Sequence, residues 1–200
     1  MQFPVNLNLV GRPVLVVGGG RIATRKVEQL LAAGADITVI APAIVDDLRA
    51  LPVTIEQRDY AAGDATRFRL VITATGNVTV DQGIFDECEE AGIWVNSADD
   101  PDRCSFTLPA TVRRGPLMVT VSTGGASPAL ASWLRARIEE AIGPEFVEIV
   151  ASLALERARV HAAGESTENI DWRPIIESTI TDAGITSPLF SIEDETEAAR

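Results

Sequence analysis

Residues 13–26 read PVLVVGGGRIATRK, and this stretch decides the fold. Its first part, Val14 to Val17, is apolar and rich in β-branched side chains, the composition of a parallel strand that is buried on both faces. Three small residues follow in the G-x-G-x-x-A spacing of a dinucleotide-binding turn: Gly18, Gly20 and Ala23. A helical pattern then runs to Gly34. We therefore predict a nucleotide-binding turn between a strand and a helix. The alternative is a similar turn that binds no phosphate.

Each small residue of this turn has its own expected task. Gly18 permits the tight turn, Gly20 lets the backbone approach a pyrophosphate, and Ala23 lets the helix lie close to the strand. The free N–H groups at the start of the helix then face the phosphates. The predicted cofactor-binding residues of the turn are consecutive: Gly18, Gly19, Gly20, Arg21, Ile22 and Ala23.

Strand and helix patterns alternate up to about residue 97. Further elements are expected as strands over 36–40, 53–57, 70–75 and 93–96, and as a helix over 79–91. The alternation predicts an α/β fold with a doubly wound parallel sheet of the Rossmann type. The carboxyl ends of parallel strands face the ligand crevice, so three more cofactor-binding residues are expected: Thr75, Gly76 and Asn77. Gly and Asn are also ordinary turn residues, which does not exclude contact with the cofactor.

The second predicted strand lacks one feature of a dinucleotide fold. Such folds usually place Asp or Glu about 20 residues beyond the glycines, where it binds the ribose 2′-OH. This sequence has Ala41 there, and the nearest acids, Asp46 and Asp47, lie in the next predicted helix. The pattern alone therefore leaves the choice between NAD and NADP open.

The pattern changes after residue 104. Strand-like runs over 105–112 and 117–122 are separated by four residues, which is hairpin spacing. Ser127 and Pro128 then predict the start of a helix that ends near Ile142. More helices are expected over 145–163 and 172–182, before an acidic, frayed end over 191–200. We divide the chain into 1–104, 105–142 and 143–200.

Composition excludes several classes of protein. Two hundred residues with 46% hydrophobic content suffice for one α/β domain with a smaller appendage. A formal charge of −12 argues against nucleic acid and anionic membranes as partners. No leader or membrane-span pattern is evident, so we expect a cytoplasmic protein. Cys88 and Cys104 lack metal-ligand spacing and His161 is the single histidine, so no metal site is expected.

Residues 96–101, Asn-Ser-Ala-Asp-Asp-Pro, follow the fifth predicted strand. They lie beside the crevice into which a nicotinamide ring would project. A carboxylate there could take a proton while the cofactor takes a hydride. Asp-Asp-Pro is also a common turn, so residue chemistry alone leaves both interpretations open.

An ordered set of motifs resembles the siroheme synthase family, specifically its NAD-dependent precorrin-2 dehydrogenase module, over residues 1–142. The matching residues are Gly18 to Gly20, Ala23, Arg25, Lys26, Ala74, Thr75, Val95, Asn96, Asp99, Pro101, Phe106, Pro109, Ala110, Arg114, Ser122 to Gly125, Ser127 and Pro128. The resemblance implies oxidation of precorrin-2 to sirohydrochlorin with NAD, within siroheme and porphyrin biosynthesis. It also implies a homodimer formed through the part after the nucleotide domain, and many family members insert iron as well.

The resemblance also implies roles for individual residues. Asp99 corresponds to the catalytic aspartate, a general base, and the adjacent Asp100 could raise its pKa. The implied substrate is a polycarboxylate, so an acidic protein must gather positive charge around it, although solvated surface arginines are common. The predicted substrate-binding residues are Asn96, Arg103, Arg113, Arg114, Ser122, Thr123, Gly124 and Gly125.

The resemblance also implies a function for each of the three parts of the chain. Residues 1–104 are the expected NAD-binding Rossmann domain, 105–142 a dimerisation and tetrapyrrole-binding unit, and 143–200 a helical region with an acidic tail. Three alternatives stay open: a bifunctional dehydrogenase and sirohydrochlorin ferrochelatase, a dehydrogenase that supplies a separate ferrochelatase, and a non-catalytic module that senses NAD or carries a tetrapyrrole. The missing metal site does not exclude iron insertion, because the macrocycle supplies the nitrogen ligands.

Overall fold

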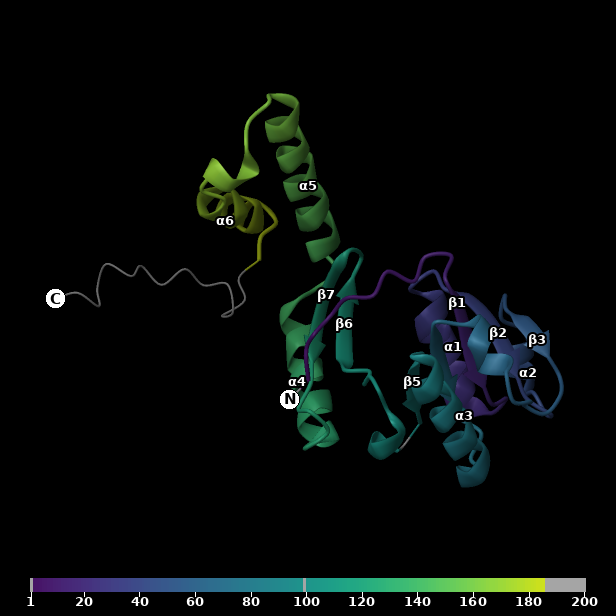
Figure 1. The fold of residues 1–200 in the computed structure, drawn as a ribbon. Helices are drawn as coiled ribbons and strands as arrows, with labels where there is room; N and C mark the ends of the chain where they lie inside the picture. The colour runs from purple at the N-terminus through teal and green to yellow at the C-terminus, as the bar shows by residue number, and fades with distance from the viewer. Residues whose placement is uncertain (1, 99, 186–200) are drawn as a thin grey trace. The chain divides into compact units, whose positions relative to one another are not determined.

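The computed structural model describes residues 2–98 and 100–185. The chain separates into two compact units, Met1–Leu108 and Pro109–Arg200 (Figure 1). Each unit is described by itself below. The three-part division with boundaries after residues 104 and 142 stays a prediction, and the expected frayed end over 191–200 lies outside the described residues.

The first unit contains a five-stranded sheet in the order β3-β2-β1-β4-β5, and every neighbouring pair is parallel. Its strands are β1 (Pro13–Val17), β2 (Asp36–Ile40), β3 (Thr54–Glu56), β4 (Leu70–Thr73) and β5 (Trp94–Ser97). Its helices are α1 (Arg21–Leu31), α2 (Asp46–Arg49) and α3 (Val78–Ala91), with 3₁₀ turns η1 (Asp64–Arg67) and η2 (Pro101–Arg103). The predicted doubly wound parallel sheet is confirmed.

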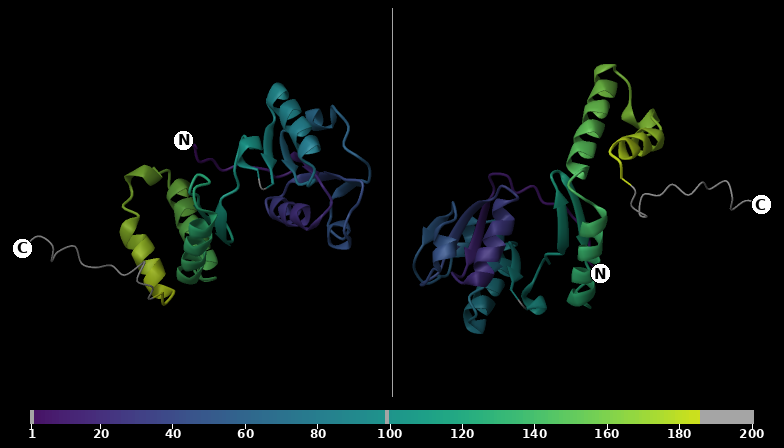
Figure 2. Two further views of the ribbon diagram at one scale, coloured as in Figure 1. Left: turned by 90° about the horizontal axis from the view of Figure 1, so that it is seen from below. Right: turned by 180° about the vertical axis from the view of Figure 1, so that it is seen from behind.

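The alternation of side chains along β1 explains why the sheet is buried on both faces. Val14 and Val16 pack into one apolar cluster with residues of α1, such as Val27. Leu15 and Val17 belong to the opposite cluster, which contains Ile84 and Cys88 of α3. Helices α1 and α3 therefore cover opposite faces of the sheet (Figures 1 and 2). All four of these β1 side chains are at most 2% exposed, as the continuous apolar run predicts.

The position of β1 between β2 and β4 indicates where the ligand crevice lies. The chain winds from β1 through β2 to β3 on one side, then crosses back to β4 and β5 on the other side of β1. Ligands of open α/β sheets bind at such a reversal, outside the carboxyl ends of the strands. The turn after β1 and the turn after β4 are therefore neighbours at this edge.

Several strand boundaries differ from the sequence prediction, and two of the differences have a clear structural cause. The fourth strand ends at Thr73 rather than at Thr75, because the hydroxyl of Thr75 accepts a hydrogen bond from the backbone N–H of Asn77 (3.0 Å) and closes a turn. The first strand of the hairpin begins at Ala110 rather than at Ser105. Ser105 is instead tied to β5, where its N–H donates to the carbonyl of Val95 (2.8 Å).

The second unit contains an antiparallel hairpin followed by helices. Its elements are β6 (Ala110–Arg114), β7 (Leu117–Val121), α4 (Pro128–Ala141), α5 (Phe146–Ala162), η3 (Thr167–Asn169) and α6 (Arg173–Asp182). The predicted start of α4 is confirmed, since the Ser127 hydroxyl caps it by accepting from the N–H of Leu130 (3.3 Å). The buried core of this unit is small: Ile142, Phe146 and Ile149 form its apolar cluster, and Val112 and Ala131 are buried as well.

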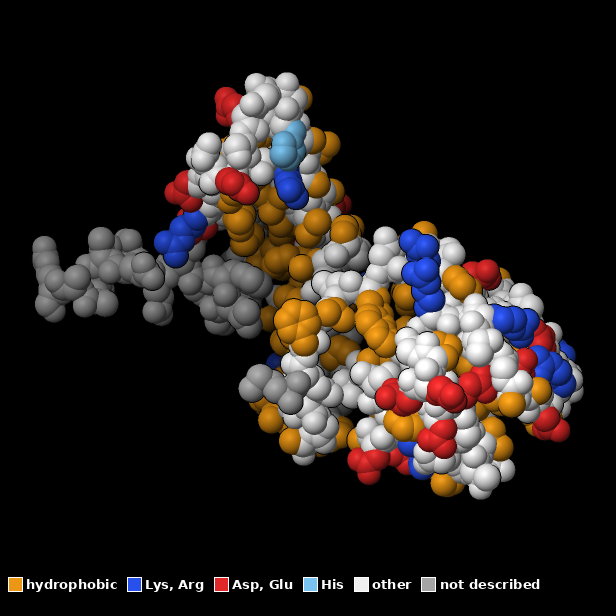
Figure 3. Space-filling view, viewed as in Figure 1, with side chains coloured by type: hydrophobic (Ala, Val, Ile, Leu, Met, Phe, Trp, Pro, Cys, Tyr) orange, Lys and Arg blue, Asp and Glu red, His pale blue; other side chains and the backbone are white. Residues whose placement is uncertain are grey.

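Apolar side chains gather beside α5 in the second unit (Figure 3). They line a groove of about 410 Å³ that includes Val150, Leu153, Ala154 and Trp172. Within the described residues no helix is both long enough and apolar enough to cross a membrane. The cytoplasmic location expected from the sequence stays a prediction.

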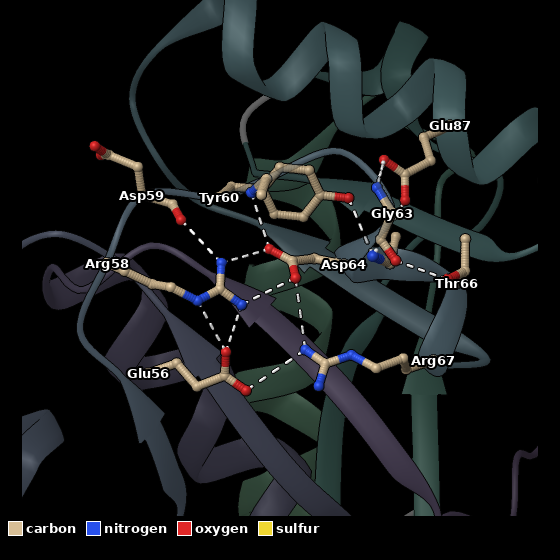
Figure 4. A network of polar contacts seen from close by, with 11 residues as sticks. Glu56, Arg58, Asp59, Tyr60, Gly63, Asp64, Thr66, Arg67 and Glu87 are labelled. Atoms are coloured by element: carbon tan, nitrogen blue, oxygen red, sulfur yellow. Dashed lines mark hydrogen bonds and ion pairs between the residues drawn. The ribbon is translucent and has the colours of Figure 1, made fainter.

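An ionic network holds the connection between β3 and β4 in the first unit (Figure 4). The Arg58 guanidinium donates to Glu56 and, at 2.6 Å, to Asp64, while Arg67 lies 3.6 Å from Asp64. The hydrogen bond from Arg58 lowers the pKa of Asp64. Burial raises the pKa of the nearby Tyr60 hydroxyl, which accepts a hydrogen bond from the N–H of Ala65 (3.1 Å). Side-chain pairs thus fix this turn, while its Ala65 and Phe68 pack into the apolar cluster that contains Ile84.

Candidate functional site

The glycine turn after β1 is shaped by two close backbone approaches. Gly18 has a φ of +129°, and a Cβ at this position would lie 2.3 Å from the carbonyl oxygen of Ala74. A Cβ on Gly19 would lie 1.9 Å from the carbonyl oxygen of Ala43. Both glycines are therefore needed so that the segments after β4 and β2 can pack against the turn. Gly19 falls on a variable position of the fingerprint, yet its contact is the tighter one.

Gly20 differs from its two neighbours because a Cβ there would meet nothing within 4 Å. It is the N-cap of α1, where no side chain caps the helix and no acidic residue lies in the first turn. The first N–H groups of a helix have no partner within it, so those of residues 21–23 can bind an anion. The open space at Gly20 lets such an anion approach the backbone.

The turn after β4 presents a hydroxyl and a carboxyl that are bonded to each other. The Thr75 hydroxyl donates to Oδ1 of Asp81 at 2.8 Å. The Asn77 side chain caps α3 by accepting from the N–H groups of Thr79 (3.1 Å) and Val80 (3.3 Å). The caps place Asp81 in the first turn of α3, where its side chain is 92% buried. Asp81 was not predicted from the sequence, where its one signal is an acid in the first turn of this helix.

The segment after β5 is held by polar contacts. Asn96 is buried and donates through Nδ2 to the carbonyl of Phe106 (2.9 Å). The Cys104 thiol donates to the carbonyl of Asp100 (3.1 Å), and burial raises its pKa. The Arg103 guanidinium pairs with the Asp100 carboxylate and donates to Oε1 of Gln82 at 2.9 Å. Asp99, the predicted base, lies outside the described residues.

The ends of β1, β4 and β5 together enclose a cavity of about 510 Å³. Of the predicted site residues it is lined by Gly20, Arg21, Ile22, Thr75, Gly76 and Arg103. Its other lining residues, which sequence reasoning missed as site residues, are Ala74, Val78, Asp81, Ser97, Ala98 and Asp100. Gly18, Gly19 and the buried Ala23 shape the turn, and Asn77 and Asn96 hold the backbone next to the cavity.

The other predicted substrate residues belong to the second unit. Arg113 is exposed on β6, whereas Arg114 holds the end of α4, with Nε donating to the carbonyl of Ile142 (2.8 Å). In the loop before α4, Ser122 accepts from the N–H of Gly124 (3.2 Å) and Thr123 accepts from the N–H of Ser127 (3.0 Å). Gly124 and Gly125 both have positive φ, at 62° and 87°, and each has open space at its Cβ position.

Comparison with known proteins assigns the family. A family model described as "Putative NAD(P)-binding" matches residues 5–110, and one described as "Sirohaem biosynthesis protein central" matches residues 114–141. The siroheme synthase of Nitrosococcus oceani is 36% identical over 189 residues, and that of Ectopseudomonas mendocina is 46% identical over 142 residues. The chain belongs to the siroheme synthase family. The resemblance found in the motifs is thereby confirmed.

The extent of the similarity differs between these relatives. The matches cover 91% and 70% of this chain but only 40% and 31% of the two siroheme synthases, so the chain spans well under half of their length. The solved structure of "SirC, precorrin-2 dehydrogenase" matches 97% of this chain and 91% of that chain, with a TM-score of 0.68 and 25% identity. The fold of the whole described chain therefore has a counterpart of similar size.

The turn and cavity fit a nicotinamide dinucleotide. The start of α1 carries no acid and Gly20 leaves its backbone open, which suits a pyrophosphate. The cavity at the strand reversal can hold the half of the dinucleotide that carries the nicotinamide. Together with the NAD(P)-binding family match, this assigns the chain a nicotinamide cofactor. Among the described residues no cluster of three His, Cys, Asp or Glu side chains could hold a metal ion.

Proposed function

We propose that this chain is an oxidoreductase that uses NAD to dehydrogenate precorrin-2 to sirohydrochlorin in siroheme biosynthesis. The observation that carries the proposal is the cavity in which the turns after β1, β4 and β5 meet, because it joins a phosphate-binding helix start to a polar segment suited to proton transfer. The similarity to a precorrin-2 dehydrogenase of nearly the same length supports the choice of substrate.

The first unit would hold the cofactor through its backbone. The N–H groups at the start of α1 bind the pyrophosphate, and Gly20 leaves room for it. The chemistry that a bound NAD supplies is the acceptance of a hydride. NAD rather than NADP rests on the family resemblance, since Ala41 stands where an acid would bind the ribose 2′-OH. The ratio of the dissociation constants for NAD and NADP tests this choice.

Asp99 would act as the general base that takes the proton released as the substrate is oxidised. Its neighbours in sequence, Ala98 and Asp100, both line the cavity. The Asp100 carboxylate is paired with Arg103 and also accepts from the N–H of Asp102 (3.1 Å). We therefore assign the proton transfer to Asp99 and a positioning role to Asp100.

The substrate carboxylates would be bound by arginines and by the loop before α4. Arg103 lines the cavity, and Arg113 is exposed. Arg114 also serves the end of α4, where it donates to the carbonyl of Glu139 at 3.1 Å. Asn96 and the loop residues complete the proposed set: Ser122, Thr123, Gly124 and Gly125. Charge reversal at Arg103 and Arg113 should weaken substrate binding and leave cofactor binding unchanged.

A homodimer would form through the second unit. Its helices expose large apolar side chains, among them Leu130 (48%), Trp133 (57%) and Leu155 (64%). Such side chains on a unit with a small core are typical of an association surface. Sedimentation equilibrium of the parent chain, with Trp133→Asp as the disrupting variant, tests this assignment.

An anaerobic absorbance time course with precorrin-2 and NAD tests the activity. Conversion to sirohydrochlorin that stops until a separate ferrochelatase and ferrous iron are added would establish a dehydrogenase alone. Siroheme formed with iron faster than in a protein-free control would establish the bifunctional enzyme. If neither NAD nor NADP supports any change, the catalytic proposal fails. A module that senses NAD or carries a tetrapyrrole would then remain.

A further inference from the structure

Asp81 is a buried carboxylate in the cavity wall to which the proposed mechanism gives no task. Its side chain is 8% exposed, and it lines the cavity from the first turn of α3. Burying a carboxyl away from water costs free energy unless hydrogen bonds replace the lost hydration. The positive end of the helix dipole offsets part of that cost. Packing alone does not explain an acid here, since an apolar residue would fill the same space without the cost.

The hydrogen bonds around Thr75 orient the Asp81 carboxylate. The Thr75 hydroxyl donates to Oδ1 of Asp81 at 2.8 Å, with the carbonyl of Asn77 as a more distant acceptor at 3.3 Å, and accepts from the N–H of Asn77 at 3.0 Å. Thr75 is therefore held at both ends of its hydroxyl. A carboxylate can accept about four hydrogen bonds through its two oxygens. Asp81 thus retains capacity for donors that come from the cavity.

The two ends of the cavity have opposite preferences for a ligand. The start of α1 offers backbone donors and carries no acid, so it favours an anionic group. Asp81 repels an anion and favours a group with hydroxyl donors. Asp100 is the other acidic residue among the described cavity residues, and its carboxylate is already paired with Arg103. A pyrophosphate followed by a ribose with two free hydroxyls matches this order of donors and acceptor.

We propose that the Asp81 carboxylate accepts hydrogen bonds from the hydroxyls of the ribose that carries the nicotinamide, while Thr75 holds the carboxylate in place. The proposal rests on the proposed use of a nicotinamide dinucleotide and adds a residue to its binding site. It places the ribose at the edge of β4, between the glycine turn and the segment that follows β5.

Equilibrium calorimetry with ADP, ADP-ribose and NAD tests this assignment without any turnover. ADP carries the pyrophosphate but no second ribose, whereas ADP-ribose and NAD carry both. Asp81→Asn should raise the dissociation constants of ADP-ribose and NAD about tenfold or more, because a charge-assisted acceptor is lost. The dissociation constant of ADP should change less than about twofold. Glu90→Gln is the matched control, since it removes an exposed carboxylate from the same helix and should change none of the three constants.

If Asp81→Asn weakens the binding of all three ligands equally, the proposal is overturned and Asp81 has a structural role. Unchanged affinity for ADP-ribose and NAD would overturn it as well. If the parent chain binds none of these ligands, this assignment fails together with the proposed use of NAD. If it binds them but does not oxidise precorrin-2, only the proposed function fails.

A ligand-side measurement keeps the test valid if Asp81→Asn fails to fold. The parent chain is titrated with ADP-ribose and with an analogue whose terminal ribose lacks the 2- and 3-hydroxyls, the two that are also free in NAD. The analogue should bind about tenfold more weakly than ADP-ribose. Equal binding of the two would overturn the proposal without any substitution in the protein.

Discussion

The glycine turn after β1 and the segment after β5 line the same cavity but are held in different ways. The turn is fixed by backbone approaches so close that Gly18 and Gly19 admit no side chain. The described part of the segment after β5, residues 100–104, is fixed by side-chain contacts, chiefly the pair of Asp100 and Arg103. In the first region fold and binding are inseparable. In the second, chemistry can be altered while the fold stays intact.

The largest expected effect is a loss of turnover without a loss of stability, caused by a substitution in the segment after β5. Asp99→Asn should lower turnover of precorrin-2 by about 100-fold or more, the usual contribution of a general base. The melting temperature and the dissociation constant for NAD should stay as in the parent chain. Asp100→Asn should have a milder effect on turnover, because Asp100 positions the segment. Turnover is measured anaerobically with saturating NAD.

An Asp99→Asn variant that turns over at the parent rate would remove the proposed base. A variant that loses NAD binding as well would show that the second region is not separable from the first. The pH profile of the parent should show one group that must be deprotonated, and this dependence should disappear from the residual activity of the variant.

The next effect concerns two adjacent glycines with opposite environments. Gly19→Ala should lower the free energy of unfolding by about 2–3 kcal/mol, because its methyl group meets the backbone of Ala43. Gly20→Ala should lower the free energy of unfolding by only about 0.5–1 kcal/mol, because Ala is a poor N-cap. It should weaken NAD binding about tenfold, because the methyl group fills the open space at Gly20. Thermal unfolding and calorimetry measure the two quantities.

Gly83→Ala provides the control for the glycine substitutions. Gly83 lies inside α3 with nothing within 4 Å of its Cβ position, so Ala there should stabilise the helix by about 0.5–1 kcal/mol. If Gly19→Ala were as well tolerated as Gly83→Ala, the glycine turn would be less constrained than its geometry implies.

A smaller effect tests the pair that holds the second region. Arg103→Met and Asp100→Asn should each lower the free energy of unfolding by about 1 kcal/mol, and the double variant should lose little more, since either change breaks the pair. The KM for precorrin-2 should rise in Arg103→Met but hardly in Asp100→Asn. If the KM for precorrin-2 rises equally in Arg103→Met and Asp100→Asn, Arg103 positions the segment and does not bind the substrate.

The sequence predicts the first region better than the second for a physical reason. A strand followed by small residues at fixed spacing can form few backbone paths, so residues 13–26 specify the turn locally. Side-chain pairs depend on which segments meet in space. The bond from Arg114 to Ile142, 28 residues away, has no local pattern, and neither has the bond between Thr75 and Asp81. Family resemblance favoured Asp99 as the base, whereas residue chemistry alone left the choice between a base and a turn residue open.

The smallest expected effect comes from a third turn that, like the second region, is held by charged pairs but lies in the β3–β4 connection. The Arg58 hydrogen bond lowers the pKa of Asp64 below its ordinary value, so the folded state favours the ionised carboxyl. The resulting stability is present above the unfolded pKa of about 3.9 and is lost as the pH falls through the lower folded value. Asp64→Asn should therefore cost about 0.5 kcal/mol at pH 7, and this cost should shrink as the pH falls below the unfolded pKa.

Amide exchange of the buried β1 and β4 backbone, followed from pH 7 downward, measures this difference in the first unit alone. Cofactor affinity at pH 7 should be the same for Asp64→Asn and the parent chain, since Asp64 does not line the cavity. A stability cost that is independent of pH would mean that Asp64 acts through packing rather than through its charge. A change in NAD affinity would mean that the network reaches the binding site. In that case charged pairs would control ligand binding in more than one part of this unit, and the contrast between the two cavity regions would be one of degree.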